Sequence, residues 1–349
     1  MFSNLRSLIF KLDPEKAHTL AIKSLQFNFV PNLFQDSEND DLFKTILFNK
    51  DLKNPIGIAA GFDKNAEVYN QLFKLGFGFV EVGTITPLSQ YGNPKPRVFR
   101  LVEDEALINR LGFNNCGAKD ALKRIKKNPQ TGLLGINIGP NKDSQNREQD
   151  YLIGLRSFHK VADYITINIS SPNTENLRNF HDQIRLDGLL KEIKKEKINL
   201  NSKIPIVVKI APDINNDDVK KISEVLINNG VEAIIISNTS NETRGELKDI
   251  QKHQKGGLSG KPLEDKSNLL INKFYKHLKN KIKIIGVGGV DSGLSAYNKL
   301  LAGANYMQLY TGMVYKGPNI VNTIKNDLAE LLLKKGVKNF AEIVGNKTK

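Results

Sequence analysis

The chain has 349 residues, of which 40% are hydrophobic and 25% charged, with 27 glycines and 13 prolines. This ordinary globular composition excludes collagen-like, disordered and disulfide-scaffold proteins. A single cysteine, Cys116, excludes an intrachain disulfide and a cysteine metal cluster. The length is compatible with two domains, or with one large barrel that carries an appendage.

The charge is strongly basic: 51 Lys and Arg against 37 Asp and Glu give a formal net charge of +14. Alone, this balance would suggest nucleic acid or an anionic membrane as a partner. Much of the excess, however, is lysine interleaved with acids at helical spacing, as in residues 191–197, which is typical of a solvated helix face. No stretch reaches the ~18 to 20 apolar residues of a transmembrane helix, and no signal peptide is recognisable. We therefore expect any membrane contact to be peripheral.

The first 30 residues predict two short amphipathic helices. Asp13 and Pro14 supply an N-cap and a first-turn proline for the second helix. The apolar face of the first helix comprises Phe2, Leu5, Leu8, Ile9 and Leu12, and the second carries Ala17, Leu20, Ala21 and Ser24, with Leu25 and Phe27 beside them. The pair could cap a barrel or lie on a membrane, which four basic against two acidic residues modestly favour. Residues 31–50, with the acidic cluster at 36–41, predict a linker.

From residue 55 onward, a short apolar run, a polar or glycine-rich break and a stretch of helical periodicity recur. The runs are residues 55–60, 78–83, 133–138, 164–169, 204–210, 233–237, 282–287 and 306–309. Continuous apolarity suits parallel strands buried on both faces, and eight strand–helix units predict a (β/α)8 TIM barrel. The alternative, an open doubly wound sheet, would place its phosphate-binding glycines after the first strand, whereas here they follow the seventh.

The carboxyl ends of the eight runs are polar, and in barrels this is where reactive residues lie. They carry Asp63, Lys64, Thr84, Asn137, Asn168, Ser171, Lys209, Ser237, Asn238, Thr239, Gly288, Gly289, Tyr310 and Thr311. One such residue is commonly a helix cap or a solvated loop residue. Because all eight ends converge on one rim, together they indicate a functional site.

Two of these ends predict a phosphate site. Glycines at 286–289 precede a helix after the seventh strand, and residues 310–312 precede one after the eighth, where barrels bind phosphate through backbone N–H groups. Asp291 stands in place of the last glycine of a dinucleotide fingerprint. Lys261 stands where a P-loop or a nucleophile elbow at 256–261 would need a glycine. With Lys64 and Lys209 on the rim, FMN fits better than NAD, because it has one phosphate and a ring that becomes anionic on reduction.

The loop at residues 168–174 places amides beside two hydroxyls. Serine is a poor base, so Ser171 can take a proton only in a dry site with hydrogen bonds or a water chain. An ordinary Ser-Pro-Asn turn is an equally good interpretation of these residues alone. The five histidines do not pair at metal-ligand spacing, and no metal is expected.

Seven segments, in this order, resemble those of the class 2, quinone-dependent dihydroorotate dehydrogenases. They are residues 59–64, 109–115, 135–139, 168–174, 208–213, 256–260 and 285–289. Residues 12–18 are also similar to that class, which favours the membrane-facing interpretation of the first two helices. We thus expect an N-terminal helical region for membrane and quinone access at residues 1–45, and an FMN-binding barrel that forms the catalytic domain at residues 46–349.

The resemblance implies oxidation of (S)-dihydroorotate to orotate in de novo pyrimidine (UMP) biosynthesis, with FMN passing the electrons to a membrane quinone. In the family, the serine at the position of Ser171 takes a proton from C5 while C6 gives a hydride to the flavin N5. Class 1 enzymes use a cysteine there, and Cys116 lies in a different loop. The alternative, a tRNA dihydrouridine synthase, should show a catalytic cysteine and an added helical RNA-binding domain, and neither is visible.

The resemblance also implies the roles of individual residues. Ser171 is the catalytic base. The substrate-binding residues are Lys64, Asn109, Arg110, Leu111, Gly112, Phe113, Asn168, Asn173, Asn238 and Thr239. The FMN-binding residues are Ala60, Gly61, Phe62, Asp63, Lys64, Thr84, Asn137, Asn168, Lys209, Ser237, Gly260, Gly289, Tyr310 and Thr311, and the quinone-site residues are His18, Arg100 and Tyr310. Ser237 stands where threonine is expected, and Thr311 where some relatives have serine, but both keep a hydroxyl.

Together, these inferences predict the oligomeric state, location and partners of the protein. It is a monomeric peripheral membrane protein on the cytoplasmic face of the bacterial inner membrane, with dihydroorotate or orotate, a quinone and the lipid bilayer as partners, and no nucleic acid. Residues 172–182 are expected to close over orotate as a lid, because a serine base needs a site without water.

Overall fold

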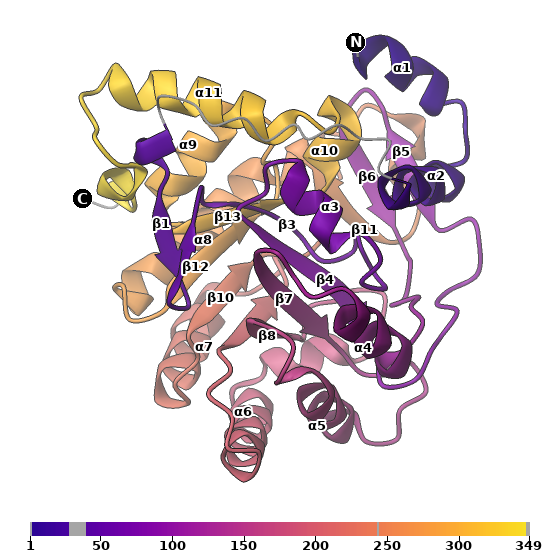
Figure 1. Cartoon of the computed structure of the whole chain (residues 1–349), viewed down its shortest axis with the longest axis vertical. Helices are drawn as coiled ribbons and strands as arrows, with labels where there is room; N and C mark the ends of the chain where they lie inside the picture. The colour runs from indigo at the N-terminus through magenta and orange to yellow at the C-terminus, as the bar shows by residue number, and fades with distance from the viewer. Residues whose placement is uncertain (1, 28–39, 243, 347–349) are drawn as a thin grey trace.

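The computed structural model describes residues 2–27, 40–242 and 244–346, with side chains from residue 5 onward. Eight parallel strands close into a barrel in the order β10-β12-β13-β3-β4-β7-β8-β9 (Figure 1). They are β3 (Ile56–Ile58), β4 (Phe79–Ile85), β7 (Leu133–Ile138), β8 (Tyr164–Asn168), β9 (Ile206–Ile210), β10 (Ala233–Ile236), β12 (Lys283–Val287) and β13 (Tyr306–Leu309). Each strand lies within or nearly within one of the predicted runs. The TIM barrel is confirmed, and the open-sheet alternative is wrong.

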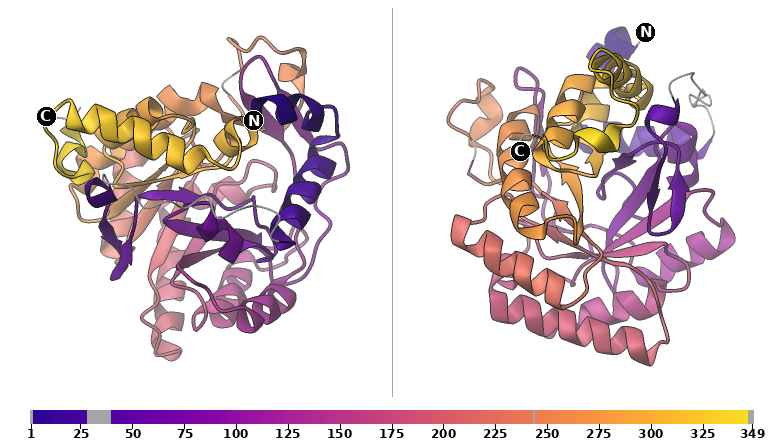
Figure 2. Two further views of the ribbon diagram at one scale, coloured as in Figure 1. Left: turned by 45° about the horizontal axis from the view of Figure 1, so that its top comes forward. Right: turned by 90° about the vertical axis from the view of Figure 1, so that its left-hand side faces the viewer.

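Helices surround the barrel (Figure 2). They are α3 (Tyr69–Lys74), α4 (Ala118–Lys127), α5 (Arg147–Phe158), α6 (Gln183–Asn199), α7 (Asn216–Asn228), α8 (Glu264–Leu278), α9 (Gly293–Ala302), α10 (Thr311–Lys316) and α11 (Ile320–Leu333), with 3-10 turns η1 (Asp40–Leu42), η2 (Leu177–His181), η3 (Ile250–His253), η4 (Lys261–Leu263) and η5 (Phe340–Ile343). In α6, Leu190 and Ile193 are buried while Lys191, Lys194 and Lys195 are exposed. The lysine-rich run is therefore a solvated helix face, as predicted.

A short hairpin, β1 (Thr45–Leu47) and β2 (Lys50–Leu52), packs against the amino-terminal end of the barrel. Its Leu47 and Leu52 join the cluster of barrel residues that includes Phe79, Leu133 and Tyr164. The linker prediction for residues 31–50 is therefore wrong over the hairpin, while residues 31–39 lie outside the described residues. Two three-residue strands are too short to show an alternating pattern, which is why no strand was predicted there.

A second, antiparallel sheet with the order β11-β6-β5 lies beside the carboxyl ends of the barrel strands. It consists of β5 (Val98–Leu101), β6 (Ala106–Asn109) and β11 (Gly257–Gly260). β5 and β6 come from the connection after β4, and β11 from the connection after β10. Buried apolar residues of the sheet form a cluster of their own that includes Leu101, Ile108 and Leu258. This sheet was not predicted, and it forms one wall of the site described below.

The two predicted N-terminal helices are α1 (Phe2–Ile9) and α2 (Pro14–Gln26). The Asp13 Oδ1 atom accepts hydrogen bonds from the Glu15 and Lys16 amides at 3.1 and 3.0 Å, which confirms the predicted N-cap. The buried residues of α2 are Ala17, Ile22 and Leu25, whereas Leu20 and Ala21, predicted to share a face with Ala17, are exposed. The predicted apolar face of α2 is thus displaced by about a quarter of a turn in the structure.

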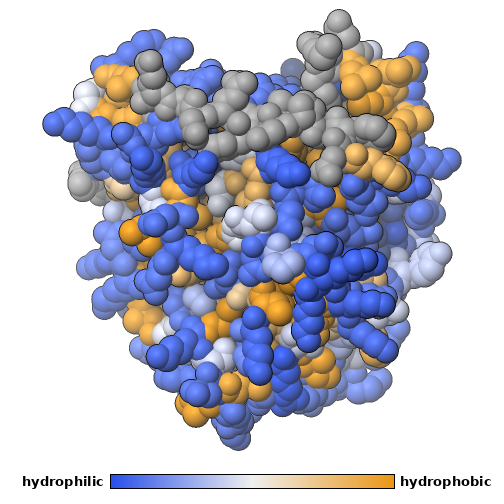
Figure 3. Space-filling model, viewed as in Figure 1, coloured by the Kyte–Doolittle hydropathy of each residue, from blue (hydrophilic) through white to orange (hydrophobic). Residues whose placement is uncertain are grey.

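Both helices are attached to the second sheet. The Arg97 guanidinium, next to β5, forms a largely buried ion pair with Glu15 of α2 at 3.0 Å. Arg100 of β5 donates to the carbonyls of Leu12, at 2.7 Å, and Phe10, at 3.3 Å, in the turn between α1 and α2. On the opposite side the helices present apolar side chains to solvent, visible as an orange patch over α1 (Figure 3). No helix in the described part of the chain is long and apolar enough to cross a membrane.

Candidate active site

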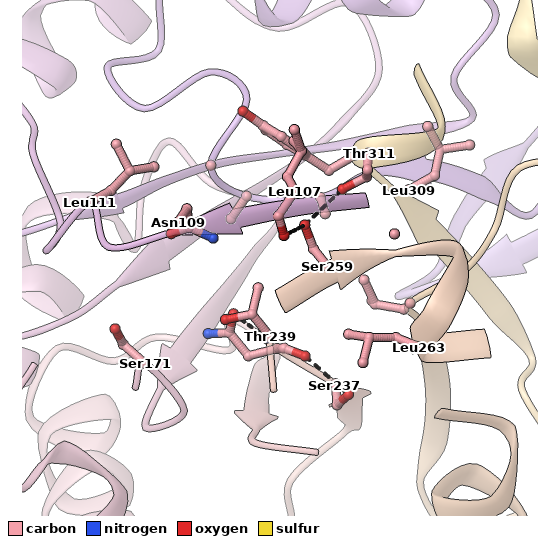
Figure 4. A pocket seen from close by; sticks show the side chains of 18 of the residues that line it. Leu107, Asn109, Leu111, Ser171, Ser237, Thr239, Ser259, Leu263, Leu309 and Thr311 are labelled. Carbon is pink, nitrogen blue, oxygen red and sulfur yellow. Dashed lines mark hydrogen bonds between the residues drawn. The ribbon is translucent and has the colours of Figure 1, made fainter. Parts of the chain in front are cut away.

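A cavity of about 1320 Å³, including its open mouth, lies between the carboxyl ends of the barrel strands and the β5-β6-β11 sheet (Figure 4). Ser171, Thr239 and Asn109 lie on one side of it, here called the polar side, with Leu111 beside Asn109. Leu107, Leu263 and Leu309 lie on the other, here called the apolar side, together with the Ser259 and Thr311 hydroxyls. The cavity wall therefore offers two regions that differ in polarity.

The structure brings most of the predicted site residues together in this cavity. Those that line it are Ala60, Gly61, Lys64, Thr84, Asn109, Leu111, Gly112, Phe113, Asn168, Ser171, Asn173, Lys209, Ser237, Asn238, Thr239, Gly260, Gly289, Tyr310 and Thr311. They come from seven of the eight strand ends, all but that of β7, and from the second sheet. Residues far apart in the sequence thus meet because parallel strands end on one rim.

Asp63 and Asn137, predicted to contact FMN, do not line the cavity but support residues that do. The buried Asp63 carboxylate accepts from the backbone amides of Glu67 and Val68, both at 2.8 Å, and so fixes the loop that carries Lys64. Asn137 accepts at its Oδ1 atom from the Thr84 hydroxyl, at 2.6 Å, and from the Asn168 amide, at 3.1 Å. Both residues lie one layer behind the cavity wall.

Four further predicted residues lie outside the cavity lining. Arg110 stacks on Phe99 and donates to the carbonyls of Pro96 and Lys255. The Phe62 ring lies edge-on between the rings of His18, at 5.3 Å, and Tyr310, at 6.0 Å. Through Phe62, ring contacts connect α2 with the cavity wall. The remaining residue, Arg100, holds the α1–α2 turn, as described above.

Ser171 lies at the polar side of the cavity and is 5% exposed. Its Oγ atom accepts a hydrogen bond from the Asn173 amide at 3.2 Å, the Asx-like turn that its sequence also allowed. The neighbouring Ser170 hydroxyl donates to Asn168 Oδ1 at 2.7 Å and accepts from Asn238 Nδ2 at 2.9 Å. These bonds fix two amide side chains on either side of the serine pair.

Asn109 and Asn173 form a second pair of amides on the same side. The Asn173 Nδ2 atom donates to the Asn109 carbonyl at 3.2 Å, which joins the loop after β8 to β6. Four asparagine side chains, counting Asn168 and Asn238, therefore surround the region next to Ser171. Such a set supplies both donors and acceptors, as recognition of a planar ring with carbonyl and N–H edges requires.

Two buried lysines place positive charge in the cavity. Burial lowers the pKa of Lys64 to about 8, although the charges of Glu15 and Asp63 act to raise it. Its ammonium donates to the Gly61 carbonyl at 2.6 Å. Burial also lowers the pKa of Lys209, against the opposing effect of Glu81. The Lys209 ammonium has no hydrogen-bond or ion-pair partner among the described residues, so it is available to a bound anion.

Glu81 is a buried carboxylate in the interior of the barrel that sequence reasoning missed. It accepts hydrogen bonds from Asn137 at 2.9 Å, Tyr164 at 3.0 Å, Thr166 at 3.1 Å and Gln308 at 3.1 Å. A buried charge is tolerated only when it is so satisfied. The available signal was a charged residue inside the otherwise apolar run at 78–83.

The glycine-rich ends of β12 and β13 form the far end of the cavity. Thr311 and Gly312 are the first residues of α10, so their amides have no helical acceptor, and neither they nor the Gly289 amide bond any described residue. Gly289 has φ +76°, and a Cβ atom there would lie 2.5 Å from Glu264, so only glycine fits this turn. Free amides and positive φ are features of backbone that binds phosphate.

Several residues of the cavity wall were not singled out from the sequence. They are chiefly the apolar residues Val98, Leu107, Leu263 and Tyr315, together with Ser259, Glu105 and Lys261. Ser259 of β11 shares a hydrogen bond with the Thr311 hydroxyl at 2.9 Å, which links the second sheet to the eighth strand end. Only knowledge of the second sheet could have identified these residues, since they lie on it or next to it.

The fold and the site define a TIM-barrel enzyme whose active site lies at the carboxyl ends of its strands. The family model described as "Dihydroorotate dehydrogenase" matches residues 42–332. A relative from Idiomarina loihiensis, named "Dihydroorotate dehydrogenase (quinone)", is 44% identical and covers 94% of this chain and 100% of its own. A relative of the same name from Bartonella tribocorum is 45% identical, covering 97% and 94% respectively.

Solved structures that resemble this chain belong to the same family. The crystal structure of a DHODH from Eimeria tenella in complex with ferulenol has a TM-score of 0.92 and 35% identity, covering 97% of this chain and 96% of that one. The ligand-free form has a TM-score of 0.91. The chain belongs to the dihydroorotate dehydrogenase family, and the names of its relatives place it in the quinone-dependent class 2. It is therefore an oxidoreductase of a flavin-dependent family. The predicted family is confirmed, and the tRNA dihydrouridine synthase alternative is wrong.

Proposed function

We propose that the chain oxidises (S)-dihydroorotate to orotate, with FMN as the flavin and a membrane quinone as the electron acceptor. The observation that carries this proposal is the position of Ser171, which shares one cavity with four asparagines, two buried lysines and free backbone amides. The reaction removes a proton from C5 and a hydride from C6, so it needs a base and a two-electron acceptor. The cavity offers a residue for the first and space for the second.

The residues present fit FMN. The unpartnered Lys209 ammonium suits a ring that gains negative charge on reduction. The free amides of Gly289, Thr311 and Gly312 suit its single phosphate, and they offer no second set for the other phosphate of a dinucleotide. FMN would supply a two-electron acceptor that can pass electrons on to the quinone. Thr84, Ser237 and Tyr310 would line the rest of its site.

The polar side of the cavity fits the substrate. The four asparagines would bond the carbonyl and N–H edges of the dihydroorotate ring, with Thr239 beside them, while Lys64 would attract its carboxylate. Ser171 would then face the ring at C5 and accept its proton. Because the side chain is nearly fully buried, little bulk water competes for that proton.

The apolar side of the cavity and the N-terminal helices fit a quinone. Tyr315, on the cavity wall, contacts Phe10 edge-on at 5.3 Å, and Phe62 connects Tyr310 with His18. Burial, aided by the Lys64 charge, lowers the pKa of His18 to about 3, so its ring is neutral near neutral pH. Residues 1–45 would form the membrane-facing region that admits the quinone, and residues 46–349 the catalytic barrel, on the cytoplasmic face of the bacterial inner membrane.

The test of the proposal is spectroscopic. Purified protein should be yellow, release FMN on denaturation, and lose its flavin absorbance when dihydroorotate is added without air. A quinone should then restore the absorbance. A protein that binds FMN but is not bleached by dihydroorotate would refute the proposed substrate, and one that binds no FMN would refute the cofactor.

The pH dependence of substrate capture should report Lys64. Its ammonium is present below pH 8 and lost above it, so kcat/KM for dihydroorotate should fall as the pH rises through about 8. In Lys64→Arg this decline should disappear, because a guanidinium stays charged. Lys261→Met, which removes an exposed lysine at the cavity rim, is the matched control and should keep the decline. Steady-state rates between pH 6 and 10 are the measurement, and an unchanged decline in Lys64→Arg would contradict the assignment.

A further inference from the structure

One side chain, Arg178, fastens the segment that follows Ser171. It lies in η2, within the predicted lid, and its guanidinium makes three hydrogen bonds. Nε donates to the Ser170 carbonyl at 3.1 Å, one terminal nitrogen to the Asp213 carboxylate at 2.9 Å, and the other to the Thr239 carbonyl at 2.9 Å. The loops after β8, β9 and β10 are thus tied together by one planar group.

Asp213 is the charged centre of this arrangement. Its carboxylate is 5% exposed and also accepts from the Ser240 hydroxyl at 2.6 Å, the Asn241 amide at 3.1 Å and the Lys266 ammonium. Burial acts to raise the pKa of Asp213, but the hydrogen bonds from Lys266, Ser240 and Asn241 outweigh it and hold the pKa below its ordinary value. The carboxylate is therefore ionised and gives Arg178 a fixed anchor.

Neighbouring residues hold the backbone around Arg178. Leu177 is fully buried, and the Phe180 ring lies edge-on to Tyr151 at 6.0 Å. His181 accepts the Ala211 amide at Nε2, at 3.1 Å, and its Nδ1 atom lies 2.8 Å from the Arg178 carbonyl. Burial lowers the pKa of His181 to about 4, in agreement with a neutral ring that accepts at one nitrogen and donates at the other. These contacts hold residues 177–181 against the barrel.

The partners of Arg178 adjoin the reacting groups. The Ser170 carbonyl is in the residue before the proposed base, and Thr239 is itself a proposed substrate contact. A displacement of either loop would change the distance between the Ser171 hydroxyl and the substrate ring, whereas the free amides proposed for the flavin phosphate lie after β12 and β13.

We propose that Arg178, anchored by Asp213, is a positioning residue for proton abstraction, which holds Ser171 at the correct place beside the ring bound by Asn238 and Thr239. This inference rests on the proposed function. It assigns the residue no contact with substrate or flavin. Its effect should therefore fall on one half of the catalytic cycle only.

The test compares Arg178→Ala with Arg185→Ala, a control that removes an exposed arginine a few residues further along the chain. In Arg178→Ala, the rate constant for anaerobic bleaching by dihydroorotate should fall about 100-fold, the typical cost of a misplacement of about 1 Å. Flavin content and reoxidation by quinone should stay within about twofold of the parent, since misplacement affects only substrate oxidation. Deuterium at C5 should slow Arg178→Ala more than the parent. Added guanidinium should restore part of its rate, since the Arg178 side chain is 24% exposed.

Three outcomes would overturn the inference. Equal bleaching rates in Arg178→Ala and Arg185→Ala would show that the three hydrogen bonds of Arg178 are dispensable for substrate oxidation. If Arg178→Ala loses flavin, reoxidation by quinone and bleaching in parallel, Arg178 has only a structural role. Asp213→Asn, which keeps the shape of the anchor, should then show the same parallel loss. If the parent protein itself is not bleached by dihydroorotate, the proposed function fails, and the inference about Arg178 fails with it. If the parent is bleached, the proposed substrate stands and the two variants test the role of Arg178 alone.

Discussion

Replacing Ser171 with alanine should leave the protein yellow and lower the rate of flavin bleaching by dihydroorotate by about 10²- to 10⁴-fold, the usual contribution of a positioned general base. The hydroxyl is the only group lost. Its one hydrogen bond within the described residues, from the Asn173 amide, belongs to a turn that the rest of the chain also holds. Anaerobic stopped-flow measurement of the flavin absorbance gives the rate constant directly.

The chain offers a closely matched control. Ser202, far from the cavity, accepts the amide two residues ahead of it at 3.3 Å, as Ser171 does at 3.2 Å. Ser202→Ala should therefore remove the same kind of turn bond with no effect on bleaching. If Ser171→Ala instead loses its flavin, or if both variants are bleached at the parent rate, Ser171 is a structural turn residue, the other interpretation that its sequence allowed.

The barrel could be predicted because its strands are buried on both faces and so appear as continuous apolar runs. The predicted runs at 133–138 and 306–309 coincide with β7 and β13, and the other strands differ from their predictions by a few residues at their ends. The second sheet and the β1–β2 hairpin escaped prediction for the opposite reason. Their strands are three or four residues long, and β11 contains two glycines, so neither alternation nor β-propensity identifies them.

For the site, the sequence was a good guide to the strand ends that form the cavity. It was a poorer guide to the side chains that face into it. Position after a strand places a residue on the rim, but the direction of its side chain depends on contacts that only the fold provides. Asp63 illustrates this, because its carboxylate turns back to two backbone amides instead of facing the cavity. Arg100 is similar, since its guanidinium is occupied by carbonyls of the α1–α2 turn. The hydrogen bonds of Arg178 join three loops that are distant in the sequence, so no single segment could reveal them.

The membrane role proposed for α1 and α2 can be tested through their exposed leucines. Leu5, Leu8 and Leu20 are 52%, 62% and 52% exposed. Replacing all three with serine should weaken binding to vesicles by about 100-fold or more, because full burial of each leucine is worth about 1.5–3 kcal/mol and even partial insertion of three gives about 3 kcal/mol. Sedimentation with phosphatidylethanolamine–phosphatidylglycerol vesicles measures the binding.

The control is a second triple variant with the same chemistry elsewhere on the surface. Leu269, Leu294 and Leu333, on α8, α9 and α11, are 57%, 59% and 52% exposed, so their replacement with serine removes a similar apolar area. Only the N-terminal variant should lose vesicle binding and turnover with a long-chain quinone. Bleaching by dihydroorotate in solution should be unchanged in both, because none of the six side chains lines the cavity. Equal loss of vesicle binding in the two variants would indicate a general effect of surface hydrophobicity, and the face of α1 and α2 would then have no special role in quinone access.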